Sequence, residues 1–278
     1  MASALPLARE IAAFDIDTYL ARSGAVDLWA VDWADVPKHP LSPEAIRTLR
    51  YMQDIESHTI VYLRSLLATR AIDDPDVAAF LACWVHEETF HGIALERFLA
   101  AAGHPLGPRP MPHGHENPAQ WLEARGTAML SRLWPEFCAV HMTWGAINEL
   151  TALTGYRRLA ARAGHPVLSG LLDHIQRDES RHFFFYYRQA EIRLQRPAVA
   201  RVARFLVDRF WGPVGSGVQP RNELRFMAGY LFGDEEGRAA AQKVDDTIRR
   251  LPGFGRVRLL ESWVDRFVKG GRNGDRSN

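Results

Sequence analysis

The chain has 278 residues, 47% hydrophobic and 24% charged, and this composition excludes an intrinsically disordered protein. Its 34 basic and 33 acidic side chains give a net charge of +1, without the basic excess typical of nucleic-acid-binding domains. Charged side chains occur too early at the N-terminus for a secretory signal, and no apolar run reaches the roughly 20 residues of a membrane span. Only two cysteines are present. We therefore expect a cytoplasmic protein with no transmembrane segment, no disulfide framework and no nucleic-acid partner.

Proline and capping residues divide the first part of the chain into long helices. Ser42–Pro43 predicts the start of a helix that continues to about residue 71. Asp74–Pro75 starts a second helix that ends near Gly103. A loop rich in Pro, Gly and His follows at 104–118, and a short helix is expected at 118–133.

The second part of the chain repeats this pattern. Pro135 starts a long helix that ends near Gly164, and Pro166 starts another that ends before Pro197. Shorter helices are then expected at 198–211, 222–232, 235–250 and 256–268, and a disordered tail at 270–278.

Strand signals are scarce, because there is no sustained alternation of apolar and polar residues. Four helices of about 28 to 30 residues would each be about 40 to 45 Å long. Short turns at 72–74 and 164–166 would join them in antiparallel pairs, and the insertion at 104–133 would provide a long crossover. We predict an all-α four-helix bundle with additional C-terminal helices, in one domain spanning 1–269 with its core at 42–196.

Two tetrapeptides of the form Glu-x-x-His lie in the middle of long helices. They are Glu88-Thr-Phe-His91 and Glu179-Ser-Arg-His182. The spacing places the carboxylate and the imidazole of each tetrapeptide on one helix face, about one turn apart. One such tetrapeptide is usually a surface pair, but two at corresponding positions indicate a metal site.

The other two long helices each contribute a glutamate near the middle. Glu88 lies 32 residues after Glu56, and Glu179 lies 30 residues after Glu149. The chain therefore uses a similar helix pair twice. One glutamate from each of two helices and Glu-x-x-His from each of the other two is the ligand pattern of di-iron carboxylate bundles.

Apolar residues surround these glutamates on their helix faces, for example Trp84 and Leu95 beside Glu88. An ionised carboxylate in such surroundings costs several kcal/mol unless it is paired. Two divalent cations would balance four carboxylates, and two neutral imidazoles would complete the set. Carboxylate oxygens with a few imidazoles suit Fe(II) or Mn(II) better than a metal that prefers thiolates.

Several neighbouring residues have more than one interpretation. Asp178 and Arg181 flank the second tetrapeptide, where they could hydrogen-bond the ligand histidines or form an ordinary ion pair. Glu87 points about 100° away from Glu88 around the helix and is not expected to be a ligand. Four further histidines on the long helices could be extra ligands, outer partners or surface residues: His58, His86, His141 and His174.

These motifs resemble the ferritin-like di-iron family. The segments His-Glu-Glu-Thr-Phe-His-Gly (86–92) and Arg-Asp-Glu-Ser-Arg-His (177–182) are similar to those of the soluble acyl-carrier-protein desaturases, and the resemblance covers about residues 42–196. It implies that Glu56, Glu88, His91, Glu149, Glu179 and His182 bind two irons, with Glu88 and Glu179 bridging them. It further implies reduction of the irons, O2 activation and oxidation of an acyl substrate, free or on a carrier protein. A ferredoxin-type electron donor and a homodimer are implied as well.

The chain departs from this family at two places. Desaturases often carry a threonine three or four residues after the third glutamate, where this chain has Ala152 and Leu153. The related arylamine N-oxygenases have a third histidine four residues before the last glutamate, where this chain has Ile175. Three alternatives stay open: an N-oxygenase of an amine, a ferroxidase or iron-binding protein, and a helical scaffold without catalysis. A mixed Fe/Mn centre is also open.

A carrier protein is acidic and would need a basic surface. The arginines that could form this surface are Arg188, Arg193, Arg196, Arg201 and Arg204. A solvated helix face is the simpler interpretation of these arginines. We also expect the helices that contain Glu56, Glu149 and the aromatic run at 183–187 to form the walls of a substrate cavity.

Overall fold

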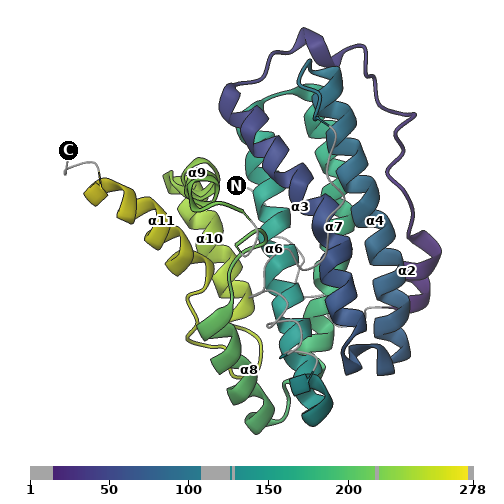
Figure 1. Ribbon diagram of the computed structural model, residues 1–278, viewed down its shortest axis with the longest axis vertical. Coiled ribbons are helices and arrows are strands. Elements are labelled where there is room, and N and C mark those ends of the chain that lie inside the picture. The colour runs from purple at the N-terminus through teal and green to yellow at the C-terminus, as the bar shows by residue number, and fades with distance from the viewer. Residues whose placement is uncertain (1–14, 108–125, 127–128, 217–218, 275–278) are drawn as a thin grey trace, which may run out of the picture.

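The computed structural model describes residues 15–107, 126, 129–216 and 219–274, and across these ranges the regular structure is helical, without a strand. Four long helices lie side by side in Figure 1: α3 (Pro43–Leu67), α4 (Pro75–Ala101), α6 (Cys138–Ala163) and α7 (Pro166–Arg193). The short 3-10 helix η2 (Arg70–Asp73) joins α3 to α4, and a tight turn at Gly164 joins α6 to α7. The prediction of an all-α four-helix bundle is confirmed.

The helix starts follow the capping residues seen in the sequence. The Ser42 hydroxyl accepts a hydrogen bond from the Ala45 N–H ahead of α3, and Asp74 caps α4 in the same way. Gly164 ends α6 with a φ of 59°, a left-handed conformation that glycine adopts without steric cost. Local sequence therefore sets both hairpin turns of the bundle.

Two ends of the long helices differ from the sequence-based expectation, and the last helix, expected from 256, begins at Leu260. Helix α3 ends at Leu67 instead of continuing to about residue 71, because the Thr69 hydroxyl donates to the Leu66 carbonyl and accepts from the Ala71 N–H. These local bonds compete with the helical ones and start η2. A 3-10 helix, η3 (Pro135–Phe137), precedes α6, so the regular α-helix begins at Cys138 instead of Pro135.

The crossover segment is described only in part. Of the helix expected at 118–133, residues 126 and 129–133 are described and are helical. The other residues of that helix, and 108–117 of the preceding loop, lie outside the described residues.

The C-terminal helices are α8 (Pro197–Phe210), α9 (Arg221–Phe232), α10 (Glu235–Ile248) and α11 (Leu260–Gly274). Helices α8, α9 and α10 pack beside α6, and α11 packs against α9 and α10 (Figure 1). The buried Arg158 of α6 donates to Asp234 and Glu236 at the start of α10, and the Trp211 indole donates to Asn148. Helix α11 includes residues 270–274 of the segment expected as a tail, and 275–278 lie outside the described residues. No described helix is both long enough and apolar enough to cross a membrane.

A short N-terminal helix, α2 (Ile16–Arg22), lies against α4, and the sequence analysis did not predict it (Figure 1). The segment after α2 includes the 3-10 helix η1 (Val36–Lys38), where the Val36 carbonyl lies 3.2 Å from the His165 Nε2 atom at the start of α7. The Tyr19 ring of α2 is buried against Phe80 of α4. The N-terminal segment is therefore packed onto the long helices.

Helices α6 and α7 are in close contact at Gly145. A Cβ atom at this position would lie 2.4 Å from the Tyr186 ring. Tyr186 is fully buried. The small residue therefore allows the aromatic ring of one helix to pack on the backbone of the other.

We expect Gly145→Ala to lower the free energy of unfolding by about 1 to 3 kcal/mol, because the buried Tyr186 ring must shift. Gly170→Ala is the matched control: Gly170 is exposed on α7 with no atom near the added methyl group, so alanine should stabilise the protein by about 0.5 to 1 kcal/mol. Urea denaturation followed by circular dichroism measures both changes. Equal effects of the two variants would contradict this packing account.

Candidate metal centre

Six side chains converge at mid-height of the bundle. Their ligand atoms form two groups of four in which all atoms lie within 4.8 Å of one another. The first group contains Glu56, Glu88, His91 and Glu179, and the second contains Glu88, Glu149, Glu179 and His182. All six side chains are buried, with at most 7% of any residue exposed. The structure thus brings together the six residues that the resemblance implied as metal ligands.

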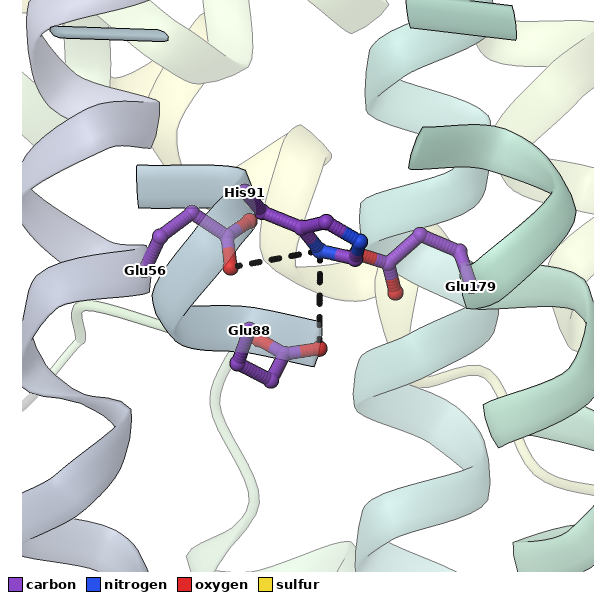
Figure 2. Close-up of side chains that lie close together, drawn as sticks. All are labelled: Glu56, Glu88, His91 and Glu179. Carbon is purple, nitrogen blue, oxygen red and sulfur yellow. Dashed lines mark ion pairs between the residues drawn. The ribbon is translucent and has the colours of Figure 1, made fainter. Parts of the chain in front are cut away.

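In the first group, the His91 imidazole lies between carboxylates from three helices (Figure 2). Its Nδ1 atom lies 3.5 Å from Glu179 Oε1, 3.8 Å from Glu88 Oε1 and 3.9 Å from Glu56 Oε2. The nitrogen and the three oxygens are therefore close enough together to bind one metal ion.

The second group has the same arrangement around His182. Its Nδ1 atom lies 3.1 Å from Glu88 Oε1, 3.8 Å from Glu149 Oε2 and 3.9 Å from Glu179 Oε2. Glu88 and Glu179 belong to both groups, whereas Glu56 and Glu149 each belong to one. The cluster is therefore a pair of adjoining sites with two shared carboxylates.

The donor atoms fit divalent cations. Six buried ligand atoms have no hydrogen-bond partner among the described residues: Glu56 Oε2, Glu88 Oε1, His91 Nδ1, His182 Nδ1 and both carboxylate oxygens of Glu179. A buried polar atom left unsatisfied costs about 1 to 3 kcal/mol. Six such atoms directed at one small region could all be satisfied by two cations. Carboxylate oxygens with one imidazole per site suit Fe(II) or Mn(II).

The charges of the four carboxylates do not fit together without cations. Burial raises the pKa of Glu56 and of Glu149 well above the ordinary value, and repulsion from Glu88 and Glu179 raises it further. Burial also raises the pKa of Glu179, but the two adjacent imidazoles of His182 and His91 outweigh this and hold it low. Without metal, the cluster therefore keeps protons that divalent cations would replace.

The outer nitrogen of each histidine faces a further carboxylate. His91 Nε2 lies 3.1 Å from Asp178 Oδ2, and His182 Nε2 lies 2.7 Å from Glu87 Oε2. The Arg181 guanidinium donates to both of these carboxylates, at 2.6 Å to Asp178 and 2.8 Å to Glu87. A carboxylate at Nε2 holds the proton there and leaves the Nδ1 lone pair for a metal. Of the two roles considered, Asp178 thus has the outer partnership with a histidine, whereas Arg181 forms ion pairs with Asp178 and Glu87.

Glu87 has a role that the sequence analysis did not find. It is fully buried, and besides His182 it accepts hydrogen bonds from the Tyr19 hydroxyl at 2.7 Å and from the Gly24 N–H at 3.4 Å. Burial by itself raises its pKa, but hydrogen bonds from His182 and Tyr19 and the charge of Arg181 lower it to about 2. Glu87 is outside the ligand cluster, as expected, but it orients a ligand. The sequence offered one indication of this role, the position of Glu87 directly before Glu88. The contact with Tyr19 could not be predicted, because Tyr19 is too distant in the sequence.

The other candidate residues lie outside the cluster. His86 and His174 are exposed, and His58 Nδ1 contacts the Asp54 carbonyl oxygen of its own helix. His141 Nε2 is buried without a hydrogen-bond partner among the described residues, and burial lowers the pKa of this histidine to about 4.

Three of the five arginines considered for a docking surface are engaged in ion pairs. Arg188 pairs with Glu191, Arg193 with Asp74 and Arg196 with Glu136. Arg201 and Arg204 are exposed on α8. The ion pairs weaken the case for a basic docking surface built from all five.

Comparison with known proteins agrees with this architecture. No family model matches the chain, and no curated protein matches it. The structure is similar to a crystal structure from Mycobacterium tuberculosis H37Rv, that of the "putative acyl-ACP desaturase DesA2", with a TM-score of 0.50 and 20% sequence identity. The similarity covers 94% of each chain. The chain therefore has the all-α, ferritin-like fold of the desaturases, and it carries buried carboxylate–histidine groups that could hold metal ions.

We expect metal binding to strengthen as the pH rises. Burial lowers the pKa values of His91 and His182, but neighbouring carboxylates outweigh this and raise them well above the ordinary value. The pKa values of Glu56 and Glu149 are raised too. A metal ion must displace protons from all four groups. The increase in Tm caused by excess Mn(II) should therefore be larger at about pH 7.5 than at about pH 5.5. An increase independent of pH would contradict the proton competition.

We expect Glu87→Gln to weaken metal binding by about 10- to 100-fold, because the amide removes the negative charge that orients His182. Asp246→Asn is the control, because Asp246 is an exposed carboxylate on α10 that pairs with Arg249. Competition with a chromogenic chelator measures both affinities. If the two variants bind metal equally well, Glu87 does not support the ligand.

Proposed function

We propose that the chain is an O2-dependent di-iron oxidoreductase that oxidises an organic substrate by desaturation or hydroxylation. The observation that carries this proposal is the pair of adjoining four-residue groups that share Glu88 and Glu179. One ion would be held by Glu56 and His91 and the other by Glu149 and His182, with the shared glutamates between them. Two irons, or iron with manganese, supply the redox chemistry that reduces O2 at such a centre.

The protein contributes position, charge and the exclusion of water. The four carboxylates balance the charge of two divalent ions, and burial keeps bulk water from the centre. Asp178 and Glu87 hold the protons on the outer nitrogens of His91 and His182, so both rings keep one orientation. Aromatic rings border the site, since Phe80 packs edge-on against both His182 and Tyr186.

The proposed substrate is a fatty-acyl chain or a similar lipid-like molecule, either as a small molecule or bound to a carrier protein. The name of the M. tuberculosis protein with the same fold supports this choice. The substrate cavity between the helices of Glu56, Glu149 and the 183–187 run stays a prediction. A ferredoxin-type electron donor, a homodimer and a cytoplasmic location stay predictions as well.

Metal analysis of protein expressed with both iron and manganese tests the centre. We expect two metal ions per chain in the wild type. Glu88→Ala and Glu179→Ala should each lose both ions, because each removes a ligand that both sites share. Glu96→Ala, an exposed glutamate two turns further along α4, is the control and should keep both ions. A folded wild-type protein without metal would overturn the proposal and leave a helical scaffold.

Oxygen consumption by the reduced, metal-loaded protein separates the remaining functions. Stimulation by acyl thioesters, with products identified by mass spectrometry, supports desaturation or hydroxylation. Stimulation by arylamines alone supports an N-oxygenase instead. Uptake of iron well beyond two ions per chain, without any stimulation by organic substrates, supports a ferroxidase or storage protein.

A further inference from the structure

Two buried aromatic side chains donate hydrogen bonds to the glutamates that belong to only one metal group. The Tyr156 hydroxyl of α6 donates a hydrogen bond to Glu56 Oε1 of α3. The Trp84 indole N–H of α4 donates to Glu149 Oε1 of α6 at 3.2 Å. Tyr156 is 1% exposed and Trp84 is 4% exposed, so water does not compete for either bond.

The second oxygen of each of these glutamates faces the ligand histidine of its own group. Glu56 Oε2 lies 3.9 Å from His91 Nδ1 and has no hydrogen-bond partner among the described residues. Glu149 Oε2 lies 3.8 Å from His182 Nδ1. In each carboxylate, one oxygen is therefore bonded to an aromatic donor and the other is directed to the position of one ion.

The two shared glutamates lack such donors. Both oxygens of Glu179 are buried without a hydrogen-bond partner, and so is Glu88 Oε1, within the part of the chain that the structure describes. Glu88 Oε2 accepts one long contact, 3.4 Å from the Thr59 hydroxyl. Aromatic donors thus bind the two glutamates that belong to one group each, whereas both oxygens of Glu179 and Oε1 of Glu88 stay available.

Resting on the proposed di-iron function, we propose that Tyr156 and Trp84 are positioning residues that hold Glu56 and Glu149 to coordination through one oxygen each. If either carboxylate bound its ion through both oxygens, the oxygen that accepts from the aromatic donor would share its electron density with the ion, which would weaken a hydrogen bond that no water can replace. Each ion would then be held by one oxygen of its own glutamate, one imidazole nitrogen and the two shared glutamates. Holding Glu56 and Glu149 to one oxygen each would leave room at the centre for a small exogenous ligand.

Packing keeps both donors in place. The Trp84 ring meets Tyr62 and Tyr186 edge-on, with ring centroids 6.1 Å and 6.0 Å away. Tyr156 is among the largest fully buried side chains of the core. Because the rings cannot turn away without opening the core, their donors stay directed at Glu56 and Glu149.

Tyr156→Phe and Trp84→Phe test this role, because each keeps an aromatic ring and removes the donor. Tyr186→Phe is the matched control: Tyr186 is equally buried and touches Trp84, but its hydroxyl has no hydrogen-bond partner among the described residues. The iron content and the near-infrared magnetic circular dichroism of the diferrous protein are measured for all four proteins, together with the binding of azide as a small anionic probe.

The wild type and Tyr186→Phe should bind two irons, show the same ligand-field bands and bind azide with the same affinity. In Tyr156→Phe and Trp84→Phe, the freed oxygen should chelate one iron, which shifts the bands of that iron and weakens azide binding about tenfold. If both donor variants keep the wild-type bands and azide affinity with two irons bound, the positioning role is wrong and the di-iron proposal stands. If the folded wild type binds no iron, both proposals are wrong.

Discussion

The rest of the structure depends on one electrostatic constraint, the burial of four carboxylates in the apolar interior of a helical bundle. Glu56, Glu88, Glu149 and Glu179 lie within a few ångströms of one another and are almost completely shielded from solvent. Their mutual repulsion in a region of low dielectric constant would open the bundle unless positive charge entered it. Protons provide part of that charge in the metal-free protein, and two divalent ions would provide all of it.

The same constraint extends outward from the ligands. Each histidine needs a partner for its outer nitrogen, and Asp178 and Glu87 are themselves buried carboxylates that need a cation. Arg181 serves both, so one guanidinium links the surroundings of the two histidines. Glu87 also accepts from Tyr19, and through this bond the N-terminal helix α2 becomes part of the support of the centre. Tyr19, which is far from the ligand motifs in the sequence, thus contacts the buried Glu87 carboxylate.

Much of the bundle could be predicted because its signals are local. Ser42, Asp74 and Gly164 mark helix ends through hydrogen bonds or backbone angles that involve only neighbouring residues. The end of α3 was missed because the Thr69 hydroxyl replaces helical hydrogen bonds with local ones, a competition that helix propensity does not resolve. Tyr156 and Trp84 could be placed in the core, but their acceptors lie on other helices, so their roles could not be predicted.

The sequence by itself determined that four long helices form and that each presents a carboxylate, with or without a histidine, on its apolar face. Periodicity and spacing of 3.6 residues per turn suffice for this, because both act within one helix. Only the tertiary structure decided which carboxylate oxygens are free and that Glu87 and Tyr19 support His182. These properties depend on the rotation and height of one helix relative to another, and packing between side chains distant in the sequence sets both.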